Sequence, residues 1–263
     1  MAKRTSLIQE RPNPFTGQMM EVVVFPTDLA EDGKASVGLA RSAKSITAKK
    51  ITKEGCRFGG PALLPKKDAW PEGPDGPLTL IGQLDFAELA KVHKGELALP
   101  KAGILSLFYD LERMPAGLER SDARYWRVVY VDDPKSGTLH EPEDDDPTPP
   151  FALTPTSRKV KNAPLHKVGG VGDWIQEDPR AAVALMAEGI ECSARGIRAA
   201  SKKGLSEATL AKRMASWKLL WQIDSDDSVG FSWHDSGMLY LFITEKDLAA
   251  RRFDRAWIHL QCH

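Results

Sequence analysis

One short segment near the C-terminal end of the sequence gathers side chains that could do chemistry: Asp224, Asp226, Asp227, His234 and Asp235. Carboxylates beside an imidazole can hold a divalent metal ion or carry out acid–base catalysis. The same mixture of Asp, Ser and Gly is typical of a turn between two strands, because Asp and Ser side chains bond their own backbone. We prefer the turn. The alternative is a catalytic set of Asp226, Asp227, His234 and Asp235, with Asp224, Asp226 and His234 as metal ligands.

Two Gln-x-Asp pairs form the second polar feature, Gln83 with Asp85 and Gln222 with Asp224. In a strand, residues i and i+2 project from the same face about 6.5 Å apart. Apolar neighbours place both pairs on central strands, where polar groups need hydrogen-bond partners. Each pair is therefore interpreted as a tether for a nearby loop. The alternative is that the two pairs share a cleft and bind a small ligand.

Tryptophans are the third candidate group. Trp174 and Trp233 stand in turn-rich segments and are candidates for a recognition surface. Four others, Trp70, Trp126, Trp217 and Trp221, are assigned to core or inter-repeat packing because each buries a large area.

Several of these candidates lie in a pattern of segments that occurs twice in the sequence. A glycine pair at Gly59 is followed by a strand with Gln-x-Asp and then by GILSLF from Gly103. A glycine pair at Gly169 is followed by Gln-Ile-Asp and then by GMLYLF from Gly237. The order is kept, so one structural unit occurs twice.

The second copy is longer between its glycine pair and its Gln-x-Asp strand. Asp178 and Pro179 can open a helix, and Ser206 can cap another. We expect a helical hairpin inserted in this interval.

The resulting prediction is an α+β fold with internally duplicated, mainly antiparallel sheet units and a helical hairpin in the second repeat. Residues 1–50 form an N-terminal extension with one strand and a poorly defined segment. Repeat one spans 51–133, an acidic and proline-rich linker spans 134–164, and repeat two spans 165–263.

The motifs FGGPALLP, LIGQLDF, KVGGVGDW and QIDSDDSVGFSWHDSGMLYLF resemble the YwqG-like domain-of-unknown-function family over roughly residues 51–261. His234 replaces the glycine expected before Asp235, and Val171 stands where relatives carry proline. The resemblance implies an α+β fold with internal duplication and supplies no catalytic residues. It also implies a loose association with polymorphic toxin gene clusters, hence an immunity-type partner of a protein toxin.

Composition limits the function classes. The 36 basic and 36 acidic residues give zero net charge, which favours neither nucleic acid nor an anionic membrane. Three widely spaced cysteines, with no apolar signal segment or membrane span, favour a cytoplasmic protein. No phosphate loop or dinucleotide motif occurs, so no cofactor is expected. We expect a non-enzymatic binding module for a protein partner or small ligand, with a metal-assisted hydrolase-like enzyme as the alternative.

Overall fold

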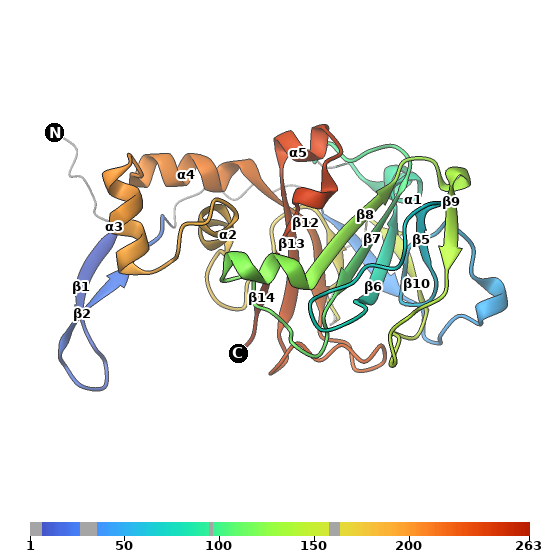
Figure 1. Cartoon of the computed structure of the whole chain (residues 1–263), viewed down its shortest axis with the longest axis horizontal. Helices are drawn as coiled ribbons and strands as arrows, with labels where there is room; N and C mark the ends of the chain where they lie inside the picture. Colours follow the sequence, from blue (N-terminus) through green and yellow to red (C-terminus); the bar gives the residue numbers. More distant parts are fainter. Residues whose placement is uncertain (1–6, 27–35, 95–96, 158–163) are drawn as a thin grey trace.

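The computed structural model describes residues 7–26, 36–94, 97–157 and 164–263. Its centre is a ten-stranded sheet in which every pairing is antiparallel, in the order β14-β13-β12-β11-β3-β10-β4-β6-β7-β8 (Figure 1). The strands are β3 (Val37–Arg41), β4 (Arg57–Phe58), β6 (Thr79–Asp85), β7 (Ile104–Tyr109), β8 (Trp126–Val131), β10 (Phe151–Thr156), β11 (Lys167–Val168), β12 (Trp217–Asp224), β13 (Met238–Thr244) and β14 (Trp257–Gln261).

The order of the strands shows an internal two-fold relation with an exchange at its centre. β3 precedes β4 in the chain but pairs with β11, while β10 precedes β11 but pairs with β4. Two matching backbone bonds make these crossings, Leu39 N to His166 O and Leu153 N to Cys56 O, each 2.9 Å long. Each repeat therefore gives its first strand to the other repeat, and the two first strands pair with each other.

Irregularities recur at matching places in both repeats. β6 shifts register between Leu80 and Gly82, and β12 does so between Leu219 and Trp221. Because β-bulges are conserved features of related structures, the matching shifts show that the duplication extends to the backbone of these strands.

The sheet draws on segments that the sequence assigns elsewhere. β3 comes from the predicted N-terminal extension, and Val37 and Leu39 are buried in the core. The predicted linker contains β10 and also β9 (Gly137–His140), which pairs with β5 (Ala62–Pro65) in a separate two-stranded sheet. Short strands of this kind lack the long alternating pattern on which the sequence interpretation depends.

The interval between β11 and β12 contains three helices where two were expected: α2 (Arg180–Ala187), α3 (Ala194–Lys202) and α4 (Glu207–Ser216). Gly189, at φ +73°, follows the end of α2, since glycine adopts the left-handed conformation without strain. Ser193 and Ser206 cap α3 and α4 through backbone N–H groups in their first turns.

Smaller elements complete the described chain. They are α1 (Phe86–Val92), α5 (Glu245–Ala249) and the 3-10 helices η1 (Ala48–Lys50), η2 (Arg120–Tyr125), η3 (Pro134–Ser136) and η4 (Phe253–Arg255). No helix in the described ranges is long and apolar enough to span a membrane.

A two-stranded hairpin projects from one end of the molecule, beside α3 (Figure 1). It consists of β1 (Ile8–Pro12) and β2 (Met19–Val23). Its base packs on the three helices through Leu7, Val23 and Phe25, whereas Phe15 at its tip is 94% exposed.

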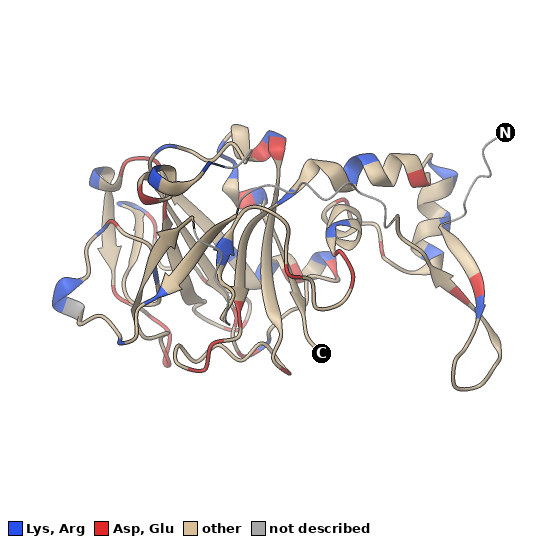
Figure 2. Ribbon diagram, turned by 180° about the vertical axis from the view of Figure 1, so that it is seen from behind, with Lys and Arg blue, Asp and Glu red and all other residues tan. Residues whose placement is uncertain are grey.

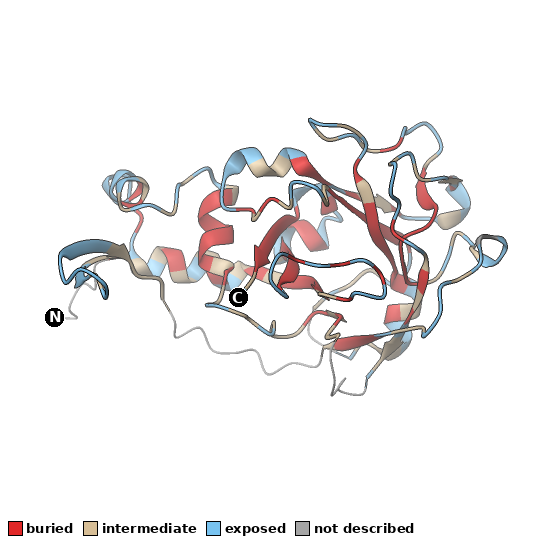
Figure 3. Ribbon diagram, turned by 90° about the horizontal axis from the view of Figure 1, so that it is seen from below, coloured by how far each residue is buried: buried red, intermediate tan, exposed pale blue. Residues whose placement is uncertain are grey.

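Buried residues concentrate in the strands of the large sheet and in α2 (Figure 3). Lysine and arginine are interspersed with aspartate and glutamate along the ribbon (Figure 2).

Candidate functional site

The first Gln-x-Asp pair holds the loop that leads into β4. Gln83 Nε2 donates to Gly55 O at 2.9 Å, and Asp85 Oδ2 accepts from Gly55 N at 2.9 Å. Asp85 Oδ1 also accepts from Ala87 N and Glu88 N, which caps α1. Both side chains are buried.

The second pair binds the backbone of the loop that leads into β11 in the same way. Gln222 Nε2 donates to Leu165 O at 2.8 Å, and Asp224 Oδ2 accepts from Leu165 N at 2.7 Å. The hydrogen bonds agree with the interpretation of both pairs as loop tethers. Since the Gln Nε2 and Asp Oδ2 atoms of both pairs bond backbone, these atoms have less capacity left for a ligand.

Asp226 is the buried member of the acidic segment and carries an ion pair between the repeats. Its Oδ2 lies 2.5 Å from Arg41 Nε, on β3, and 3.4 Å from His166 Nε2. Burial would raise the pKa of this carboxyl group, but the hydrogen bonds of His166 and Arg41 and the charge of Arg41 lower it instead. Asp226 also pairs with Phe231 across a turn, as the turn interpretation requires.

The remaining members of the segment point to solvent. Asp227, His234 and Asp235 are exposed, and His234 has φ +50°. Within the described ranges, no three His, Cys, Asp or Glu side chains are grouped so that they could hold a metal ion, and this includes the alternative set of Asp224, Asp226 and His234.

The expectation that Trp233 lies on a recognition surface is wrong. Its side chain is fully buried, stacks on Phe231 with ring centroids 5.0 Å apart, and meets the edge of Tyr109. Trp174 is half-buried against Tyr240 and Phe242. A turn-rich neighbourhood places a backbone near the surface but does not decide where a large apolar side chain packs.

A pocket of about 570 Å³ lies where the two edge strands of the sheet, β8 and β14, approach each other. Trp126 and Trp257, the first residues of these strands, meet edge to face at 5.3 Å. Trp126 Nε1 donates to Ala256 O, and Trp257 Nε1 donates to Gly117 O at 3.0 Å. Because their N–H groups are bonded, both indoles are fixed and present their ring carbons to the pocket region.

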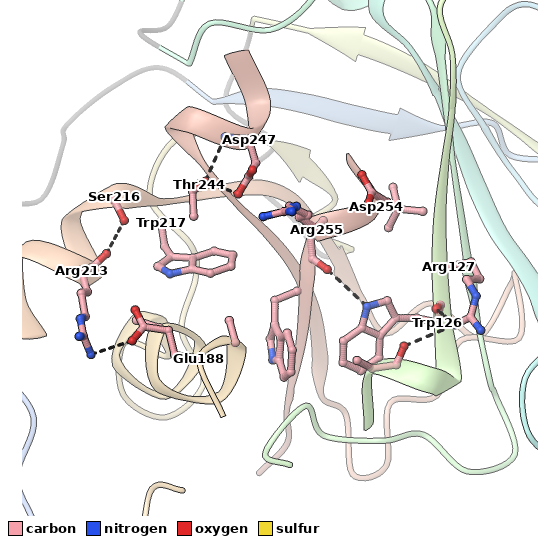
Figure 4. Close-up of a pocket in the computed structure, with 16 residues that line it drawn as sticks. Trp126, Arg127, Glu188, Arg213, Ser216, Trp217, Thr244, Asp247, Asp254 and Arg255 are labelled. Atoms are coloured by element: carbon pink, nitrogen blue, oxygen red, sulfur yellow. Dashed lines mark hydrogen bonds and ion pairs between the residues drawn. The ribbon is translucent and has the colours of Figure 1, made fainter. Parts of the chain in front are cut away.

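The other wall comes from the start of β12 and from α2. Trp217 starts β12 and lies across the pocket from Trp126 (Figure 4). Ala184 and Ala187 of α2 complete the apolar lining on this side. Small residues here leave room between the tryptophans.

Six charged residues, three of each sign, line the pocket: Arg127, Arg213, Arg255, Glu188, Asp247 and Asp254. Arg213 pairs with Glu188 at 2.9 Å, and Asp247 pairs with Arg252. Among described residues, neither Asp254 nor Arg255 has an ion-pair partner. An aromatic interior with a few charged groups is the usual composition of a small-molecule site.

Sequence reasoning assigned Trp126 and Trp217 to packing and missed the pocket. Both are buried, as that assignment requires, and both also line the pocket. The available signal was that tryptophan begins both closing strands, in YWRVVYV and AWIHLQ.

A family model described as a domain of unknown function (DUF1963) matches the chain twice, over residues 56–161 and 139–262. The two matches confirm the predicted repetition, and their overlap contains β10, the strand that one repeat gives to the other. No curated protein matches the chain.

Proposed function

The chain belongs to the DUF1963 family, and we propose that it is a non-enzymatic binding module that takes a small organic ligand in the pocket between its edge strands. The observation that carries this proposal is the pocket itself, walled by Trp126, Trp217 and Trp257 and rimmed by charges. Its volume falls within the range of about 300 to 1,000 Å³ that is usual for ligand pockets.

A flat ligand that carries a charged group fits this lining, because Arg255 and Asp254 both lack an ion-pair partner among the described side chains. Indole rings offer area for stacking, and Arg255 offers a cation without a partner among the described side chains. The metal-assisted hydrolase alternative has less support, because Asp226 is already ion-paired with Arg41 and lies within hydrogen-bond distance of His166.

We expect 1-anilinonaphthalene-8-sulfonate, a flat aromatic sulfonate, to bind the native protein at one site and to lose that site in Ala187→Phe. Ala187 lines the pocket, so a phenyl ring there takes up its space. Fluorescence titration measures the affinity, and we expect it to fall at least tenfold.

The matched control is Ala215→Phe, an exposed position on α4 that does not line the pocket. Equal affinity in both variants, or no stoichiometric binding to the wild type, contradicts the small-ligand proposal.

A protein partner is the second candidate, favoured by the hairpin tip. Phe15, Met19 and Met20 are 94%, 61% and 42% exposed on one projecting element. Exposed apolar side chains gathered in this way mark interaction surfaces. An immunity-type role would place a protein toxin here.

For this candidate we expect Phe15→Ser to abolish retention of a partner that the wild type captures at equal protein load. Leu118→Ser, at an exposed position far from the hairpin in sequence, serves as the control and should retain the partner. Quantitative affinity capture distinguishes the two, and identical capture by both variants counts against the hairpin.

We extend the proposal to the family subgroup, the cellular location, the cofactor and the partners of the protein. We place the chain in the YwqG-like group and in the cytoplasm, with no resident cofactor and no nucleic acid or membrane as partner. We also treat the helices between β11 and β12 as an insertion into the second repeat. The repeat limits predicted from the sequence, 51–133 and 165–263, leave out the exchanged strands β3 and β10, and we propose that these two strands belong to the repeats as well. Zero net charge and the interspersed charges in Figure 2 support the expectations about partners.

A further inference from the structure

Both repeats have a row of polar side chains at equivalent positions, but the hydrogen-bond partners of these side chains differ between the repeats. In the second repeat, Lys167, Gln222 and Tyr240 are direct neighbours across β11, β12 and β13. Directly opposed residues in antiparallel strands project from the same face. These three side chains therefore form one row.

Asp173, four residues after the first glycine of the pair, links the members of this row. Its Oδ2 accepts from Lys167 Nζ at 2.5 Å and from Gln222 Nε2 at 2.9 Å. Its backbone N donates to Gln222 Oε1 at 2.8 Å, and its backbone O accepts from Tyr240 Oη at 2.7 Å. One carboxylate and its own backbone thus satisfy the cation, the amide and the phenol.

In the first repeat the equivalent row is Arg57, Gln83 and Ser106. The position equivalent to Asp173 is Leu63, whose side chain packs in an apolar cluster with Ile104. Arg57 Nη2 donates to Pro61 O. Within the part of the chain that the structure describes, Arg57 Nε and Nη1, Gln83 Oε1 and Ser106 Oγ are buried without a hydrogen-bond partner.

Arg57 is therefore a buried cation for which no carboxylate partner is found among the described side chains. Only 3% of the residue is exposed. Burial lowers the pKa of its guanidinium to about 10, so it remains charged at neutral pH. A buried charge is costly unless it is paired and hydrogen-bonded, so this arrangement calls for an anionic group.

We propose that the first repeat binds a small free oxyanion of the carboxylate or bicarbonate type on the Arg57 guanidinium, in the role that Asp173 has in the second repeat. Nε–H and Nη1–H point to opposite sides of the guanidinium, so an oxygen of the anion accepts a single charge-assisted hydrogen bond from one of them. The Ser106 hydroxyl supplies a further donor on the same face, and a protonated oxygen, as in bicarbonate, can donate to Gln83 Oε1. Burial restricts the ligand to the size of formate, acetate or bicarbonate.

The test uses formate as the probe and follows the melting temperature of the full chain. Formate replaces chloride at constant ionic strength, so that general salt effects cancel. We expect the Tm of the wild type to rise by about 3 to 5 °C for each tenfold increase in formate above its dissociation constant. Arg57→Met keeps the length of the side chain without its charge and should show no rise.

Lys167→Met is the matched control, because its partner Asp173 belongs to the chain. It should lose stability yet keep the formate response. A flat Tm in the wild type, or the same slope in Arg57→Met as in the wild type, overturns the proposal. A flat wild type with a more stable Arg57→Met also overturns it and shows that the buried charge costs stability without an anionic partner.

If Arg57→Met does not fold, ¹³C-formate line broadening by the wild type, with bicarbonate as competitor, decides the question. Broadening that bicarbonate reverses supports the site. The absence of broadening at millimolar formate overturns it.

Discussion

Replacement of Trp233 by alanine is expected to lower the free energy of unfolding by about 3 to 5 kcal/mol. Trp233 is fully buried between Phe231 and Tyr109, so the truncation leaves a cavity that packed neighbours fill only in part. Urea denaturation followed by far-UV circular dichroism measures the change without relying on tryptophan fluorescence.

Trp174→Ala provides the comparison, because Trp174 is only half-buried on Tyr240 and Phe242. It should cost clearly less than Trp233→Ala. If Trp233→Ala costs less than about 1 kcal/mol, the indole is not part of the core, and the surface role predicted from the sequence returns.

Acidification between pH 6.5 and 4 is expected to destabilise the wild type by about 2 to 3 kcal/mol through His259 alone. Burial lowers the pKa of His259 from 6.5 to about 4. Between pH 6.5 and 4, the unfolded chain therefore binds a proton on His259 that the folded chain does not bind. The stabilisation is complete above pH 6.5 and is lost as the pH falls towards 4.

His259→Asn should remove this dependence, and His234→Asn, at an exposed position, should keep it. The measurement is the free energy of unfolding at pH 7 and pH 4.5, where carboxyl groups with ordinary pKa values remain mostly ionised. Parallel losses in wild type and His259→Asn would show that His259 does not carry the effect.

The repeat and its polar pairs could be predicted from the sequence because their signals are local. Gln83 and Asp85 are two residues apart on one strand, and that spacing fixes a shared face whatever surrounds the strand. The same reasoning applies to Gln222 and Asp224. Their partners, the backbones of Gly55 and Leu165, follow from the order of the elements.

The exchange of β3 and β10 could not be predicted in this way. Val37–Arg41 is five residues long and contains glycine, so its pattern does not distinguish a strand from a loop. Its place depends on β11, more than 120 residues away. Pairing between distant segments is set by tertiary packing, which no local periodicity records.

The pocket was missed for a related reason. Trp126 and Trp257 are 131 positions apart, and only closure of the sheet brings them together. The burial of Trp233 depends likewise on Tyr109, from the other repeat. The burial of side chains that contact residues of both repeats is the hardest to predict from the sequence.

The crossing of β3 and β10 also bears on how such a chain could arise and how it can be divided. A half-length polypeptide with one copy of the unit would leave its first strand and its second strand unpaired with each other, and both would need a second molecule. Two such molecules related by a two-fold axis would rebuild the same ten strands. The present chain is in this sense a dimer joined end to end, and severing it between the copies should yield fragments that reassociate, with neither one folding alone.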